Sequence, residues 1–177
     1  MAGNPWLQEM PDPISKVTWD NYITMSPETM KKDGYATTFD QENGLNMATV
    51  KVGNESITLP VYPSPGQAAG TIGIALGYGR GEGNEEIGNA AFVTKEYGGF
   101  ELDEKGNRVS VGKNAFRFLT WENGTYQNNV TGSLTSEIAK GKYPIAATQI
   151  HHTVMSRNSI VKETTLDIYQ NEEPGTY

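Results

Sequence analysis

The chain has 177 residues, 36% hydrophobic and 20% charged, which predicts one globular domain with a single core. Its formal net charge of −7 repels phosphate groups, which argues against nucleic acids and anionic membranes as partners. The absence of cysteine excludes disulfides, cysteine-ligated iron–sulfur clusters and zinc ribbons within these 177 residues.

The N-terminal stretch predicts extended structure followed by a helix. Prolines at positions 5, 11 and 13 disfavour a helical start, because the residue before a proline avoids helical backbone angles. Over residues 16–23 apolar and polar residues alternate, which is typical of a strand. The segment SPETMKKDG, residues 26–34, predicts a helix with Ser26 as its N-cap and Gly34 as its terminator.

The middle of the chain predicts short strands joined by tight turns. Two alternating runs in residues 47–63 flank the turn pair Gly53-Asn54 and predict a β-hairpin. Residues 64–79 predict a turn and then a short apolar strand. The polar segment at about 82–110, with its two internal turns, predicts a projecting hairpin inserted into the domain.

The C-terminal part predicts two more strands and a closing helix. The strands are FRFLTW at 116–121 and KYPIAATQI at 142–150, and the helix is ETTLDIYQNEE at 163–173. Many short strands with only two short helices favour a mainly β fold closed, or nearly closed, into a barrel.

The glycine-rich stretch GIALGYGRGEGN, residues 73–84, resembles a phosphate-binding loop at first sight. A dinucleotide-binding fingerprint would need its third glycine at position 82 or 84, where the chain has Glu82 and Asn84. Acidic residues follow where a pyrophosphate would favour positive charge. We therefore expect a turn here, with Gly77 and Gly79 required by a sharp bend or a close backbone approach.

Metal binding and covalent catalysis have little support in the residue pattern. His151 and His152 are adjacent, and neighbours on a strand point to opposite faces, so we expect no metal site. Neither YPSPG nor TGSLT provides the setting of a serine nucleophile. From its residues alone, we expect a domain that is not catalytic by itself.

Four stretches of the chain resemble, in order, a specific protein family. They are NPWLQEMPDPISKVTWDNYITMSP, PSPGQAAGTIGIALGYGR, VGKNAF and TQIHHTVMSRNSIVKETTL. They are similar to the molybdopterin-oxidoreductase-like, iron–sulfur-bearing subunit of bacterial alternative complex III. The resemblance implies the C-terminal domain of the molybdopterin oxidoreductases, a six-stranded double-psi β-barrel with a few short helices. Residues 1–177 would then be one domain of a longer chain.

The resemblance also implies a cellular context. The parent subunit would belong to a membrane quinol-oxidising electron-transfer complex, on the periplasmic face of the bacterial inner membrane. Its partners would be other domains of the same chain and other subunits, without direct membrane insertion of this domain. Family members place these positions on the cofactor side of the barrel: Gly77, Tyr78, Gly79, Arg80, Gly112, Asn114, Gln149, His151 and His152.

Two functional hypotheses follow from the resemblance. In the first, this domain has a structural and interaction role and holds no cofactor, with iron–sulfur clusters elsewhere in the parent chain. In the second, it contacts molybdopterin guanine dinucleotide in an active oxidoreductase. Two departures from the family weaken a pterin-binding role: the insertion near 82–110, and NAFR in place of the family's NAYP, which puts Arg117 where the proline would be.

Overall fold

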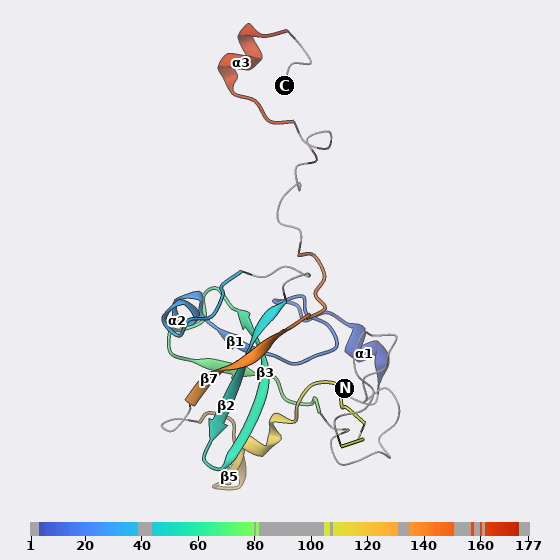
Figure 1. Cartoon of the computed structure of the whole chain (residues 1–177), viewed down its shortest axis with the longest axis vertical. Coiled ribbons are helices and arrows are strands. Elements are labelled where there is room, and N and C mark those ends of the chain that lie inside the picture. The colour runs from blue at the N-terminus through green and yellow to red at the C-terminus, as the bar shows by residue number, and fades with distance from the viewer. Residues whose placement is uncertain are drawn as a thin grey trace.

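The computed structural model describes residues 4–38, 44–79, 81, 105–106, 108–130, 135–150, 157, 160 and 162–173. In these residues the fold is mainly β, built on a five-stranded sheet of order β4-β1-β3-β2-β7 (Figure 1). The five strands are β1 (Ile23–Met25), β2 (Leu45–Val52), β3 (Glu55–Pro63), β4 (Ile72–Ile74) and β7 (Thr135–Tyr143). The strands β1 and β3 run parallel, while the other neighbours are antiparallel.

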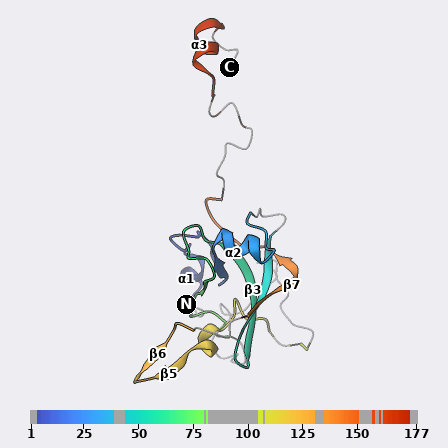
Figure 2. The same ribbon diagram turned by 90° about the vertical axis from the view of Figure 1, so that its left-hand side faces the viewer.

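A second, two-stranded sheet projects from the body (Figure 2). It is the hairpin of β5 (Thr120–Glu122) and β6 (Thr125–Gln127). The rings of Trp121 and Tyr126 pack edge to face across it, with centroids 4.8 Å apart. Such a pair adds roughly 0.5–1.5 kcal/mol and helps a two-stranded ribbon that would otherwise be marginal.

Two elements predicted from local chemistry are confirmed. The strands β2 and β3 form the hairpin around Gly53-Asn54, with Val52 opposite Glu55. The helix α2 (Pro27–Lys32) lies inside the predicted 26–34 segment, and Ser26 Oγ accepts a hydrogen bond from the Thr29 amide at 3.1 Å. The helix ends before Gly34, whose φ is +82°.

The predicted closing helix is also confirmed, over a shorter range. The helix α3 (Leu166–Asn171) begins after Thr165, whose hydroxyl accepts from the Ile168 amide at 3.4 Å. It buries none of its residues, and Figures 1 and 2 show it well apart from the sheet.

The prediction of an extended start is wrong. The helix α1 (Pro5–Glu9) begins directly after Asn4, whose side chain accepts from the Trp6 amide at 3.0 Å. Proline is favoured at the first helical position because its missing N–H has no helical partner there. The Asn4-Pro5 pair is therefore a helix start. The prediction failed because it treated Pro5 as a residue that disfavours a helix.

The predicted strand over 16–23 is mostly wrong as well. Lys16 and Trp19 have φ of +63° and +67°, which interrupts an extended chain. Val17 makes one isolated bridge to Ala147, and regular pairing begins at Ile23.

The two predicted C-terminal strands are shifted. The first half of FRFLTW is the 3₁₀ helix η4 (Ala115–Phe118), capped by Asn114, and the strand β5 starts at Thr120. KYPIAATQI belongs to a strand only up to Tyr143, because Pro144 cannot donate to a ladder. The long strand β7 was missed.

The described residues contain more helices than predicted, and their strands do not close into a barrel. Among the described residues, α1 and η4 are present in addition to α2 and α3, the two helices expected. The described strands form an open sheet with β4 and β7 at its edges, so a closed six-stranded barrel is not observed in this part of the chain. Most of the predicted insertion, residues 82–104 and 107, lies outside the described residues.

The two faces of the sheet carry different clusters. On one face α2 and η4 cover the main core, which includes Ile23, Met30, Val50, Val61 and Ala115. On the opposite face a smaller cluster packs against tyrosines: Val17, Leu45 and Ile145 with Tyr22, Tyr62, Tyr143 and Ala147. Alternation along β3 explains the division, since Val61 and its neighbour Tyr62 must point to opposite faces.

None of the helices described is long and apolar enough to cross a bilayer.

The α2 cap provides a test of the fold. Ser26 is buried, and its hydroxyl also contacts that of Thr29, which in turn accepts from the Gly70 amide at 2.8 Å. We expect Ser26→Ala to lower the free energy of unfolding by about 1–2 kcal/mol in urea denaturation. Thr165→Ala is the matched control, because it removes the cap of a helix that buries nothing and should leave the transition unchanged. Equal effects of the two variants would contradict this assignment.

Candidate functional site

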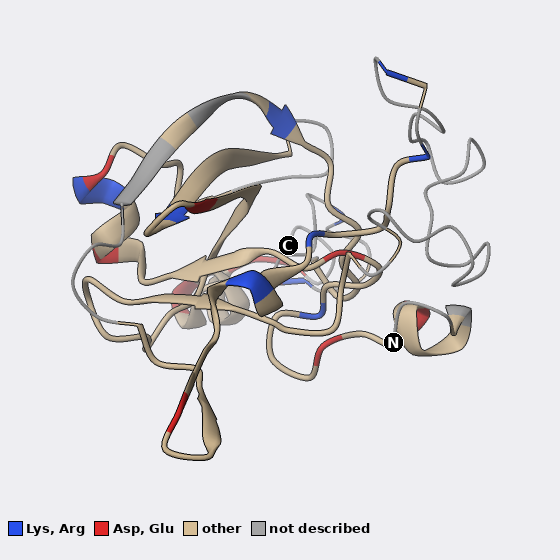
Figure 3. Cartoon of the chain, turned by 90° about the horizontal axis from the view of Figure 1, so that it is seen from below, with Lys and Arg blue, Asp and Glu red and all other residues tan. Residues whose placement is uncertain are grey.

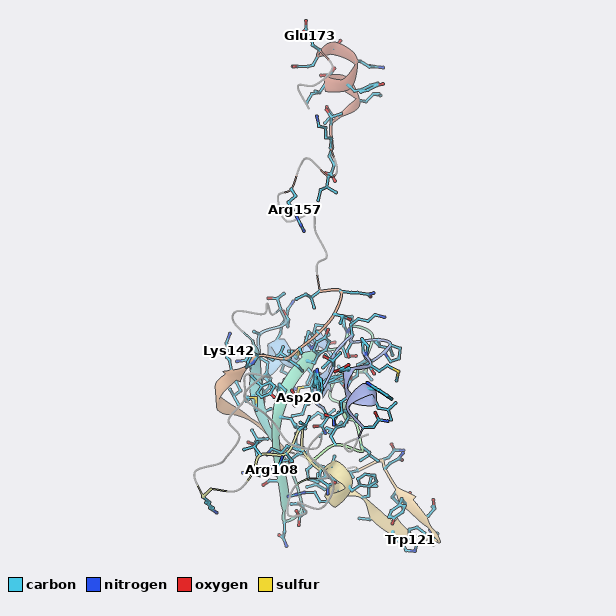
Figure 4. The ribbon with its side chains drawn as sticks, turned by 90° about the vertical axis from the view of Figure 1, so that its right-hand side faces the viewer. Asp20, Arg108, Trp121, Lys142, Arg157 and Glu173 are labelled. Carbon is cyan, nitrogen blue, oxygen red and sulfur yellow. The ribbon has the colours of Figure 1, made fainter. Side chains whose placement is uncertain are left out.

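The structure brings together two of the predicted cofactor-side loops. The Gly79 amide donates to the Val111 carbonyl at 3.0 Å, which joins the loop 77–79 to the loop 111–115. Four predicted site residues, Tyr78, Gly79, Gly112 and Asn114, therefore lie in one contact region. Asp20, labelled inside the body in Figure 4, belongs to the same region.

Gly79 and Gly112 are required by close approach. A Cβ on Gly79 would lie 2.2 Å from the Asn114 nitrogen and 2.4 Å from the Lys113 carbonyl carbon. A Cβ on Gly112 would lie 2.7 Å from Asn21 Oδ1 and 2.9 Å from the Tyr78 Cβ. The sequence-based expectation of a close approach is thus confirmed at Gly79, and Gly77 supplies a turn with φ of +96° in open space.

The side chain of Asn21 holds this region together. It is completely buried, and its Nδ2 donates to the carbonyls of Ala75 and Lys113 at 3.2 and 2.9 Å. Its Oδ1 accepts from the Lys113 amide at 2.9 Å. One amide side chain therefore satisfies both backbone groups of Lys113 and links them to the end of β4.

Asp20 occupies the neighbouring position, and its carboxylate accepts hydrogen bonds from two different segments. The Tyr143 hydroxyl, at the end of β7, donates to Asp20 Oδ2 at 2.7 Å, and the Gly112 amide donates to the same carboxylate. Burial raises the pKa of Asp20, and these hydrogen bonds with the charge of Lys113 act against that rise. Burial and the nearby Asp20 charge also raise the pKa of Tyr143.

A second polar network lies beside the tyrosines of the same face. Asp12 Oδ1 accepts from the backbone amides of Ile14 and Ser15 at 2.9 and 2.8 Å, and from the Ser15 hydroxyl at 3.0 Å. The Ser15 hydroxyl also contacts the Tyr22 hydroxyl, and the Ser15 carbonyl accepts from the Tyr62 hydroxyl at 2.8 Å. This network fixes the turn 12–16 onto β3.

The ionisation of this network follows from burial and hydrogen bonding. Burial acts to raise the pKa of Asp12, but the hydrogen bonds from Ser15 and Ile14 outweigh it and the pKa is lowered. Burial is also the main cause that raises the pKa of Tyr22 and of Tyr62.

The charges of both acidic residues act on Tyr78. Burial raises the pKa of its hydroxyl, and the negative charges of Asp12 and Asp20 raise it further. The region around the two glycine loops therefore has negative charge within it, which disfavours a phosphate-bearing ligand. Figure 3 shows acidic and basic residues interspersed over the described body rather than gathered in one large basic area.

Of the other predicted site residues, Gln149 stands apart from this region and three are not described, while Asn114 within the region has a capping role. Gln149 is exposed with φ of +55°, and among the described residues no hydrogen bond joins it to either loop. Asn114 acts as a helix cap, since its Oδ1 accepts from the Phe116 amide at 3.0 Å. Arg80, His151 and His152 lie outside the described residues.

Metal binding finds no support in the part of the chain that the structure describes. Within it, no group of three or more histidine, aspartate or glutamate side chains could hold a metal ion.

The residues that organise the region were missed by sequence reasoning. Asp20 and Asn21 follow an apparent strand, and nothing in their spacing distinguishes them from surface residues. Their partners are 123 and 92 residues away along the chain. A signal was present in Gly79 and Gly112, because Gly79 lies against the backbone of residues 113–114 and Gly112 lies against the side chains of Asn21 and Tyr78.

No protein-family model matches this chain, and no curated protein matches it significantly.

The two neighbouring glycines of the first loop provide a matched test. Gly79→Ala would drive a methyl group into the backbone of residues 113–114, and we expect a loss of about 3 kcal/mol or more in the free energy of unfolding. Gly77→Ala also has a positive φ but meets no atom within 4 Å, so we expect about 1–2 kcal/mol. Urea denaturation of both variants decides the matter, and a larger effect at Gly77 would show that the loops are not in contact.

The two aspartates should have opposite effects on the pH dependence of stability. Because the folded-state pKa of Asp20 is raised, its contribution is greatest below the ordinary carboxyl pKa of about 4 and is lost as the pH rises through the raised folded-state pKa. Because the pKa of Asp12 is lowered, its contribution is present above about pH 4 and is lost as the pH falls.

Unfolding measured from pH 3 to pH 7 tests this difference. Relative to Asp20→Asn, the wild type should lose stability as the pH rises. Relative to Asp12→Asn, it should gain stability over the same range. The same sign for both differences would contradict the arrangement of charges described above.

Proposed function

We propose that this chain is a domain of a molybdopterin oxidoreductase-family subunit in a membrane quinol-oxidising electron-transfer complex. In this proposal the domain packs against other domains of its chain and other subunits, on the periplasmic face of the inner membrane. It has a structural role and holds no cofactor of its own. The proposal begins from the resemblance of four sequence stretches to the alternative complex III subunit.

One observation supports the structural role over pterin binding. Two backbone amides of the glycine loops are already bonded within the protein, Gly79 to Val111 and Lys113 to Asn21, and the amide of Gly112 acts on the Asp20 carboxylate. The Asp20 carboxylate takes the position at Gly112 that an anionic ligand would need. This use of the loop amides within the protein supports a domain that holds no pterin dinucleotide.

The finer fold belongs to the same proposal. We propose a double-psi β-barrel, in which a further strand pairs with an edge of the described sheet. The parallel pairing of β1 with β3 supports it, because parallel neighbours need a crossover connection of the kind such barrels contain.

The alternative is a pterin-contacting domain of an active molybdopterin oxidoreductase. The observation in its favour is that the loops 77–79 and 111–115, which the resemblance assigns to the cofactor side, do meet in space.

Purification of the parent protein from the organism that carries its gene separates the two functions. The structural role predicts co-purification with membrane subunits, quinol-oxidising activity of the assembly, and molybdenum far below one atom per polypeptide. One molybdenum atom and a pterin per polypeptide would contradict it, provided that both are lost in Arg80→Ala. Lys31→Ala is the control, since Lys31 is an exposed cation on the helix α2.

A further inference from the structure

Two Asn-Gly pairs occur in the sequence, Asn43-Gly44 and Asn123-Gly124, and the fold places their glycines in opposite surroundings. Gly44 is buried, and a Cβ on it would lie 2.6 Å from the Tyr143 carbonyl oxygen. Asn123 and Gly124 are exposed, and a Cβ on Gly124 would meet no atom within 4 Å. Because both pairs have the same two residues, a difference in their chemistry would come largely from the fold.

The exposed pair forms the turn of the projecting β5–β6 hairpin (Figure 2). Glu122 pairs with Thr125, so Asn123 and Gly124 alone make the turn, with φ of +51° and +78°. Positive φ at both positions is the hairpin turn that Asn-Gly favours. In the part of the chain that the structure describes, neither the Gly124 amide nor the Asn123 side chain forms a hydrogen bond. Both groups are therefore available to react with each other.

Asparagine is chemically labile because the backbone nitrogen of the next residue can attack its side-chain amide carbon. Here the Gly124 nitrogen would bond to Asn123 Cγ while the bond from Cγ to Nδ2 breaks. The proton lost by the Gly124 nitrogen leaves with Nδ2 as ammonia, and a succinimide ring remains. Water then opens the ring at either carbonyl, which gives aspartate or isoaspartate. Glycine favours the attack because it has no Cβ to obstruct its nitrogen.

The other two-residue hairpin turn, between β2 and β3, is a matched comparison. Asn54 in that turn is also exposed, but the residue that follows it is Glu55, which has a side chain. Glu55 is also the first residue of β3 and is paired with Val52. Its nitrogen is therefore hindered and held in a strand, whereas the nitrogen of Gly124 is not.

We propose that Asn123 is a self-modification site, at which the exposed turn of the β5–β6 hairpin converts to isoaspartate without an enzyme. The proposal depends on the geometry of this turn and not on the oxidoreductase-family proposal. Its only co-reactant is water.

The modification would change the hairpin itself. Isoaspartate carries the main chain through its side-chain carbons, which adds one carbon to a two-residue turn. Glu122 and Thr125 can then no longer lie directly opposite each other, and the edge-to-face contact of Trp121 with Tyr126 is lost. Figure 4 shows Trp121 at the far end of this projection. Because a two-stranded ribbon is marginally stable, the hairpin opens.

Peptide mapping of the purified full chain, kept at pH 8 and 37 °C, tests the proposal. We expect Asn123 to gain about 1 Da, as a mixture of isoaspartate and aspartate, at least tenfold faster than Asn43 or Asn54. In urea, where the fold is absent, Asn123 and Asn43 should react at similar rates, because both precede glycine. Asn123→Gln should abolish the modification at this position.

Hydrogen exchange of the isoaspartate form, separated by ion exchange, provides the second measurement. Residues 120–127 should exchange at least tenfold faster than in the unmodified chain. Asn123→Asp is the matched control, because it adds the same charge without the extra main-chain carbon and should leave this exchange unchanged. The proposal is overturned by no mass gain at Asn123, or by a ratio of the Asn123 and Asn43 rates that is the same in urea and in the native protein. An isoaspartate form whose hairpin exchanges like the unmodified chain also overturns it.

Discussion

The buried amide of Asn21 is the interaction on which the arrangement of the glycine loops depends. Its three hydrogen bonds join the start of β1 to Ala75 after β4 and to both backbone groups of Lys113. Each buried backbone group left without its partner would cost about 1–3 kcal/mol. With Lys113 fixed in this way, Gly79 must lie directly against residues 113–114, and a side chain cannot fit there. The close contact of the two loops follows from this one side chain.

The same constraint decides what chemistry the loops can perform. A loop that binds a phosphate must present backbone N–H groups that the protein has not already used. Here the amides of Gly79 and Lys113 donate to a carbonyl and to a side-chain amide oxygen of the same chain, and the amide of Gly112 acts on the Asp20 carboxylate. The Asp20 carboxylate also adds negative charge next to Tyr78. Packing between elements is the role that this geometry favours, and it underlies the proposal of a structural domain within a larger assembly.

Sequence reasoning succeeded where structure is decided by neighbours along the chain. The α2 helix depends on Ser26 and Pro27 at its start, and the β2–β3 hairpin depends on Gly53-Asn54. It failed where distant contacts decide. Lys16 and Trp19 have left-handed backbone angles inside an alternating pattern, and β7 owes its strand structure to pairing with β2, far away in the chain. Asn21 could not be recognised, because only the fold brings it to Lys113.

Hydrogen exchange of the Lys113 amide tests the central claim most directly. The account predicts slow exchange of this amide and of Gly79 in the wild-type protein. Asn21→Ala should speed exchange at Lys113 by about a hundredfold, as expected for a loss near 3 kcal/mol, while the α2 amides change much less. A Lys113 amide that exchanges freely in the wild type, or at the same rate in Asn21→Ala, would contradict it.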